Sequence, residues 1–128
     1  MSLTVPAELL AQAQAGSISD QHFVQCIKNS LPYAWSVVDD VAGKLRAGGE
    51  AFAVSEDVPP SEQEWGQLFR LVASDAMRAA VEQHYGVRLA FQNCCKVGLF
   101  QPAAVAEYAE FTSARAQVLN QKPEFLNC

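Results

Sequence analysis

Residues 61–86 have the sequence SEQEWGQLFRLVASDAMRAAVEQHYG, and this stretch decides the predicted fold. Ser61 and Glu64 stand three apart at its start, as in a capping box, where the serine oxygen accepts a hydrogen bond from the third residue after it. Gly86 ends the stretch with the residue type that most often follows a helix. Apolar side chains recur between these limits on one helical arc: Trp65, Leu68, Phe69, Val72, Ala73, Ala76, Ala79 and Ala80. We therefore expect one continuous helix to about residue 85, with this arc facing the centre of the protein.

Helical patterns continue on both sides of this stretch, and proline, glycine or a capping residue marks most of their limits. Pro32 divides one long pattern into two helices, because a proline inside a helix clashes with the carbonyl four residues earlier. Ser17 or Ser19 caps the first of these two helices. The expected helices cover residues 5–16, 20–30, 32–48, 102–111 and 113–120.

Two stretches lack the helical pattern. Residues 50–60, EAFAVSEDVPP, are expected to form a linker with a short extended piece at 51–54, since two prolines end it. Residues 87–91 alternate in polarity and contain β-formers, with 96–100 as the partner strand; a buried extended segment or a short helix is the alternative. The predicted fold class is mainly α: a compact bundle of about five helices, with at most one short β-hairpin near residues 87–100. We expect one domain over residues 1–128.

The composition describes an acidic globular chain. The 128 residues carry a net charge of −5, and the nine basic residues form no cluster. Nucleic-acid binding needs a positive surface that releases counterions, so we expect no nucleic-acid partner. No apolar run is long enough to cross a bilayer, and the first residues lack the pattern of a signal peptide, so we expect a cytoplasmic protein without a membrane partner. In that compartment the four cysteines should stay free thiols: Cys26, Cys94, Cys95 and Cys128.

His22 and Cys26 are a candidate pair of metal ligands. They stand four apart on an expected helix, which places both side chains on one face, and both residue types bind zinc or copper. The alternative interpretation is stronger, because a free cysteine beside an apolar arc usually packs as a small hydrophobic residue. The chain also has no CxxC pair to supply further ligands, so we expect neither a metal nor another cofactor.

Cys94 and Cys95 are the candidate reactive thiols. Lys96 follows them directly, and a nearby positive charge favours the nucleophilic thiolate. Burial among the apolar neighbours Phe91 and Val97 is the favoured alternative, since no base stands at a position that would activate either thiol.

Arg70, Ser74 and Arg78 are the candidate partner-binding residues. Their spacing places them in a row on the polar face of the expected long helix, where the two guanidinium groups suit an anion or a carboxylate. A solvated face with local ion pairs, such as Asp75 with Arg78, is the commoner role for such a row.

Two classes of function follow from these observations. The leading hypothesis is a non-enzymatic protein-binding module of the inhibitor, immunity or adaptor type, which acts through an acidic helical surface and has another protein as its partner. The alternative is a small cysteine-dependent enzyme, or a metal- or ligand-binding protein, that uses Cys94 and Cys95 or His22 and Cys26. Thiol titration and metal analysis distinguish the two classes.

Overall fold

The computed structural model describes residues 2–92, 95–121 and 123, and these form a mostly helical protein with one small sheet. The order of elements along the chain is α1 (Ala7–Gln14), α2 (Asp20–Ser30), α3 (Pro32–Gly48), β1 (Phe52–Ser55), α4 (Glu62–Val72), α5 (Asp75–Tyr85), β2 (Arg88–Gln92), β3 (Lys96–Phe100), α6 (Val105–Phe111) and α7 (Ala114–Leu119). The mainly helical prediction is confirmed, and so is the hairpin near residues 87–100.

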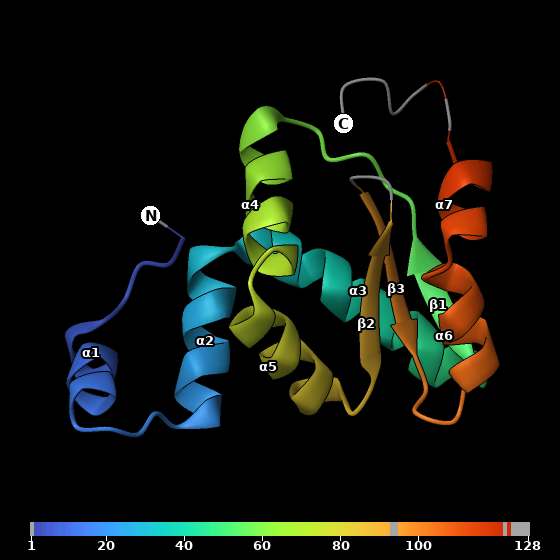
Figure 1. The fold of residues 1–128 in the computed structure, drawn as a ribbon. Coiled ribbons are helices and arrows are strands. Elements are labelled where there is room, and N and C mark those ends of the chain that lie inside the picture. The colour runs from blue at the N-terminus through green and yellow to red at the C-terminus, as the bar shows by residue number, and fades with distance from the viewer. Residues whose placement is uncertain (1, 93–94, 122, 124–128) are drawn as a thin grey trace.

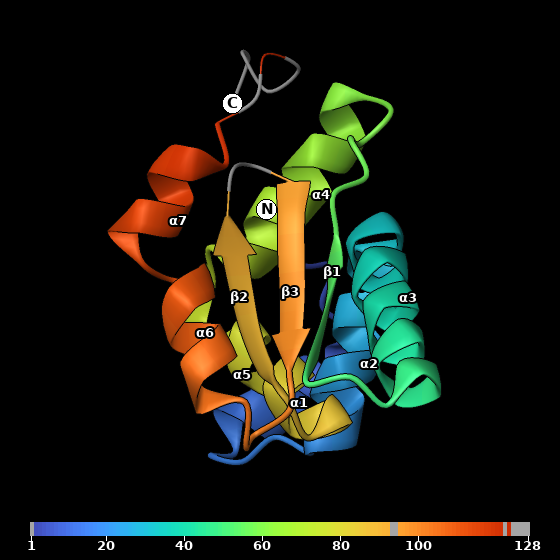
Figure 2. The same ribbon diagram turned by 90° about the vertical axis from the view of Figure 1, so that its right-hand side faces the viewer.

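The sheet has three antiparallel strands in the order β1-β3-β2 (Figures 1 and 2). Strand β3 pairs with β2 as the expected hairpin, with Ala90 opposite Gly98. On its other side β3 pairs with β1, where Val54 also lies opposite Gly98. The short extended piece expected inside the linker is therefore a full member of the sheet, and it forms one edge.

The sheet lies between two helical layers, and this sheet of three strands exceeds the predicted helical bundle with at most one short hairpin. Helices α2 to α5 lie on one side of the sheet, and α6 and α7 lie on the other (Figure 1). Alternation along the strands explains this arrangement, because successive side chains point to opposite faces of a sheet. Leu89, Val97 and Leu99 belong to the larger core with α2 to α5, whereas Ala90 and Phe100 belong to a second cluster under α6.

The expected helix over residues 61–85 is two helices, and the prediction of one continuous helix is wrong. Helix α4 ends at Val72, and Ser74 leaves the helical conformation at φ −100° and ψ 117°. The Ser74 side chain then accepts a hydrogen bond from the Met77 N–H at 3.2 Å and caps α5. Serine favours such N-cap positions because its oxygen satisfies an N–H that the helix leaves unpaired.

The break changes which side chains of α5 face the core. Met77 and Val81 are buried, whereas Ala76 and Ala79 are exposed. The alanine-rich arc predicted to face the protein centre is therefore largely on the surface in α5. Alanine is a poor guide to which face of a helix is buried, since its small side chain fits both the core and the surface.

Several other local signals are confirmed, although the helix expected from residue 102 begins only at Val105. Ser61 caps α4 by accepting from the Glu64 N–H at 3.3 Å, and Ser19, rather than Ser17, caps α2. Pro32 begins α3, which ends before Gly49 in the left-handed conformation at φ 64°.

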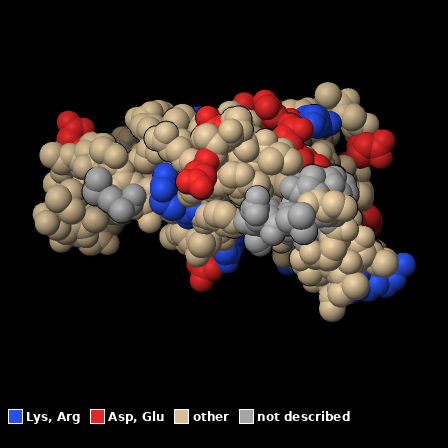
Figure 3. Space-filling model, turned by 90° about the horizontal axis from the view of Figure 1, so that it is seen from above, with Lys and Arg blue, Asp and Glu red and all other residues tan. Residues whose placement is uncertain are grey.

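Acidic side chains are prominent on one face of the protein surface. Several Asp and Glu side chains gather on the face shown in Figure 3, whereas the Lys and Arg atoms visible there lie apart from one another. Within the described residues, no helix is long and apolar enough to span a lipid bilayer.

Candidate functional site

An open groove lies between the edge strand β1 and the helices α6 and α7. Helix α6 packs over β2, the edge strand opposite β1. This placement leaves β1 partly uncovered on the face of the sheet that α6 covers (Figure 2). The groove has a volume of about 610 Å³. Its lining comes from β1, β3, both helices and the residue after α7: Phe52, Val54, Lys96, Ala106, Glu107, Glu110, Phe111, Arg115, Ala116, Leu119 and Asn120.

Aromatic rings form the base of the groove. The fully buried ring of Phe100 lies 5.1 Å from the stacked ring of Phe52 and 5.2 Å from the ring of Phe111, measured between centroids. Gly98 makes this packing possible, because a Cβ atom there would lie only 2.8 Å from Phe100 Cε1. The glycine in β3 therefore fixes how closely α6 approaches the sheet.

Lys96 joins three segments at one end of the groove. Its ammonium nitrogen lies 3.0 Å from Asn120 Oδ1 and 3.2 Å from Glu56 Oε1, and the Phe111 ring centroid is 5.8 Å away. The Lys96 side chain is only 14% exposed, so these contacts are better protected from water than those of a surface ion pair. Lys96 thus holds the end of α7 against the sheet.

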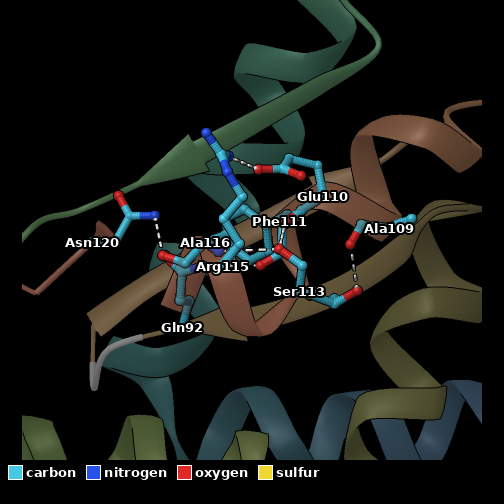
Figure 4. A network of polar contacts seen from close by, with 9 residues as sticks. Gln92, Ala109, Glu110, Phe111, Ser113, Arg115, Ala116 and Asn120 are labelled. Atoms are coloured by element: carbon cyan, nitrogen blue, oxygen red, sulfur yellow. Dashed lines mark hydrogen bonds and ion pairs between the residues drawn. The ribbon is translucent and has the colours of Figure 1, made fainter. Parts of the chain in front are cut away.

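A second polar network fixes the junction between α6 and α7 (Figure 4). The buried Gln92 side chain donates from Nε2 to the Phe111 carbonyl at 2.9 Å, which ties β2 to the end of α6. Ser113 caps α7 by accepting from the Ala116 N–H at 3.0 Å. Arg115 and Glu110 form an ion pair at 2.5 Å across the junction. These contacts fix the positions of α6 and α7, which form the helical wall of the groove.

The groove presents apolar side chains to solvent on both sides. Phe52 on β1 is 40% exposed and Leu119 at the end of α7 is 64% exposed. Exposed apolar side chains gathered around a hollow commonly mark a binding surface. Among the described residues, the charged groups of the lining include one carboxylate without an ion pair, Glu107, whereas Lys96 and Arg115 are both paired.

His22 and Cys26, the candidate metal pair, both line one small pocket between α1 and α2, and each has its own hydrogen-bond partner. The His22 ring is exposed, and its Nδ1 atom lies 2.8 Å from Gln12 Nε2. Cys26 is 2% exposed, and its sulfur donates to the Thr4 carbonyl at 3.5 Å. Within the described residues there is no group of three His, Cys, Asp or Glu side chains able to hold a metal ion.

Only one of the two candidate reactive thiols lies in the described residues. Cys95 is 1% exposed, and its sulfur lies 3.8 Å from the Glu56 carbonyl oxygen as a donor. Cys94 and Cys128 lie outside the described residues. Cys26 and Cys95 are free thiols, and the prediction that all four cysteines are free stays a prediction.

The row Arg70, Ser74 and Arg78 falls at the break between α4 and α5. Ser74 caps α5, and Arg78 donates to the Asp75 carboxylate and to the Val72 carbonyl. Arg70 is exposed near the end of α4. The break thus uses two of the three side chains to join the helices, and the straight polar row expected on one helix does not exist.

Sequence reasoning did not identify the groove, because its lining comes from segments far apart in the chain. Phe52 lies in the expected linker, Lys96 in the hairpin and Leu119 in the last helix. The available signals were the alternation of Phe52 and Val54 in the extended piece and the consecutive apolar pair Val118 and Leu119 near the end of a helix.

A family model described as NucS shadow ORF, with the label KH_NucS_shadow, matches residues 1–128, so the chain belongs to this family. No curated protein and no solved structure matches the chain.

Proposed function

We propose that this member of the NucS shadow ORF family is a non-enzymatic binding protein, whose groove between β1 and α6–α7 docks a segment of another protein. The observation that carries the proposal is the pair of large apolar side chains, Phe52 and Leu119, exposed on the two sides of a mostly apolar groove of about 610 Å³. Their removal from water on binding would supply the main driving force, at about 25 cal/mol for each Å² buried. On the helical side of the groove Glu110 is paired with Arg115, and Glu107 adds a carboxylate without an ion pair among the described residues, in line with an acidic helical surface.

The alternative, a small enzyme or metal-binding protein, has less support from the described residues. A nucleophilic cysteine needs a partly exposed and electropositive setting, whereas Cys95 is buried beside a backbone carbonyl. Cys26 is also buried, and its sulfur donates to Thr4 rather than toward His22.

Nucleic acid is a third class of partner, and we expect none. The letters KH in the family label also abbreviate an RNA-binding module, which clamps the backbone of four nucleotides with a G-x-x-G loop. No two of the seven glycines in this chain stand three apart, and the α4–α5 junction is Ala73–Ser74. Arg78 at this junction is paired with Asp75. Fluorescence anisotropy with labelled single-stranded DNA and RNA, at low salt, would detect binding if this expectation is wrong.

The test of the proposed function is selection of peptides from a random display library against the purified protein. Selected peptides should lose binding to Leu119→Asp, because the carboxylate would be desolvated in the groove. Val118→Asp is the matched control, since Val118 is 70% exposed on the same helix and does not line the groove. Peptides that bind both variants alike, or a selection that yields no binder, would contradict the proposal.

A further inference from the structure

The outer edge of β1 presents unpaired backbone groups. The Gln101 N–H donates to the Ala51 carbonyl at 2.9 Å, and the register places these residues opposite each other. Hydrogen-bonded and non-hydrogen-bonded pairs alternate along an antiparallel ladder, so Ala53 and Ser55 also bond to β3. The N–H and C=O groups of Phe52 and Val54 therefore point away from β3. Within the described residues, neither N–H has a hydrogen-bond partner.

At the opposite edge of the sheet, β2 has an outward N–H group with a hydrogen-bond partner. There the Leu89 N–H of β2, which also points away from β3, donates to Glu82 Oε2 of α5 at 3.0 Å. Proteins commonly cover or block sheet edges, because an open edge pairs with other chains. The β2 edge thus has one outward N–H that a side chain of α5 accepts, whereas the outward N–H groups of β1 lie beside the groove without such an acceptor among the described residues.

The open edge and the groove form one continuous surface. Phe52 and Val54 contribute side chains to the groove lining, and they are also the residues with outward backbone groups. A strand added beside β1 would place every second side chain on the same sheet face, directly next to the groove. Backbone hydrogen bonds would then provide affinity, and the groove would select the alternate side chains.

Charge defines the partner further. Lys96 and Arg115 in the lining already form ion pairs with Glu56 and Glu110. Glu107 remains as the lining carboxylate without an ion pair among the described residues. A basic side chain on the added strand would complement it, since opposite charges across an interface favour the correct partner.

We propose that the groove binds an extended segment of a partner protein by strand addition to β1, with apolar residues at alternate positions and a neighbouring Lys or Arg facing Glu107. This inference rests on the proposed function and names how that same site binds. A second copy of this chain is a poorer occupant. In an antiparallel pair of two β1 strands, Phe52 of each copy would lie opposite Val54 of the other. The same register would set Glu50 of one copy opposite Glu56 of the other, and like charges at opposed positions destabilise a strand pair.

The experiment compares Val54→Pro with Val54→Ala, with peptides selected from the display library and synthesised singly as probes. The Val54 N–H points outward, so proline leaves the bonds between β1 and β3 intact, and proline is tolerated on edge strands. Proline should weaken binding by on the order of tenfold, whereas alanine, which keeps the N–H, should weaken it less. Circular dichroism melts of both variants check the fold.

A second measurement leaves the protein unchanged. Each selected peptide is N-methylated at one backbone nitrogen at a time. Strand addition predicts that methylation at alternate positions abolishes binding, whereas methylation at the intervening positions is tolerated, because only every second N–H faces β1. The selected sequences should show alternating apolar residues with a Lys or Arg, and Glu107→Lys should favour acidic residues instead.

The outcomes separate the inference from the proposed function. Loss of binding in Leu119→Asp, together with tolerance of Val54→Pro and of all N-methyl groups, would overturn strand addition and keep the groove as the binding site. A self-associating protein that Val54→Pro makes monomeric would identify a second copy as the occupant and overturn the partner assignment. Selected peptides that bind Leu119→Asp as well as the unchanged protein would overturn both.

Discussion

The carboxylate of Glu82 on α5 accepts a hydrogen bond from the Leu89 N–H of β2 at 3.0 Å. Glu82 is therefore part of the sheet's hydrogen bonding, although it belongs to a helix. Leu89 is buried, so its N–H has no ready access to water as a substitute partner. One side chain thus accepts a hydrogen bond from a buried donor at the edge of the sheet that would otherwise be unpaired.

Glu82→Ala should destabilise the protein by about 1–3 kcal/mol, because it leaves the buried Leu89 N–H without its acceptor. Glu82→Gln is the control, since the amide oxygen can accept the same hydrogen bond. Urea denaturation followed by circular dichroism measures the free energy of unfolding for both. Equal stability of Glu82→Ala and the unchanged protein would mean that water replaces the carboxylate.

Gly98→Ala should cost about 1–3 kcal/mol of stability, because the added carbon would lie 2.8 Å from Phe100 Cε1 and 3.3 Å from Phe111 Cζ in a packed cluster. Gly43→Ala is the matched control. Gly43 lies inside α3, and apart from the nearby backbone of its own helix and its chain neighbours no atom would lie within 4 Å of an added Cβ, so alanine there should stabilise the helix by about 0.5–1 kcal/mol. Thermal melts of the two variants should therefore shift in opposite directions.

Ser74→Ala should cost about 1 kcal/mol, because it removes the acceptor for the Met77 N–H at the start of α5. Ala76→Leu tests the same junction from the other side. Ala76 is exposed, so leucine there should change stability by no more than about 0.5 kcal/mol. A continuous helix would give the reverse ranking in chemical denaturation, with Ala76→Leu the more damaging variant.

Tyr85→Phe should cost about 1 kcal/mol near neutral pH, because the Tyr85 hydroxyl donates to Asp39 Oδ1 at 2.7 Å and joins α5 to α3. Burial, followed by the hydrogen bond to Asp39, raises the pKa of Tyr85 above its ordinary value of 10.0. The folded state therefore keeps the phenol proton more strongly than the unfolded state. This stabilisation is fully present below pH 10.0 and is lost as the pH rises above it. Urea midpoints across this alkaline range should fall more steeply for the unchanged protein than for Tyr85→Phe.

Local signals in the sequence predicted much of the fold correctly. Ser61, Pro32 and Gly86 act on the few residues next to them, so their effects on helix limits can be seen without tertiary structure. The strands β2 and β3 are only three residues apart in the sequence, and their pairing was also predicted from the pattern.

Interactions between distant segments explain the errors. Strand β1 has only four residues, and it pairs with β3 although α4, α5 and β2 lie between them in the sequence. A short window of sequence therefore does not reveal this pairing. The break at Ser74 was hidden because alanines fit both a buried and an exposed face, although Ser74 with Asp75 is itself a capping pattern. The groove required α6 to lie over β2 rather than β1, which depends on Phe100 and Gly98 packing against Phe111.

The two faces of the sheet have cores of unequal size. The larger cluster joins four helices to the sheet, whereas the buried residues of the other are Ala90, Phe100 and Ala104, with Tyr108 and Phe111 partly buried against them. Regions with little buried apolar contact open locally at a lower free energy than the rest of a protein. Helices α6 and α7 should therefore form a separate cooperative unit, whose amide hydrogens exchange with solvent before those of α2 to α5. A ligand that bridges α7 and β1 would stabilise α6 and α7 and so slow this exchange. Because the core under these two helices is small, binding in the groove should change their local stability more than that of α2 to α5.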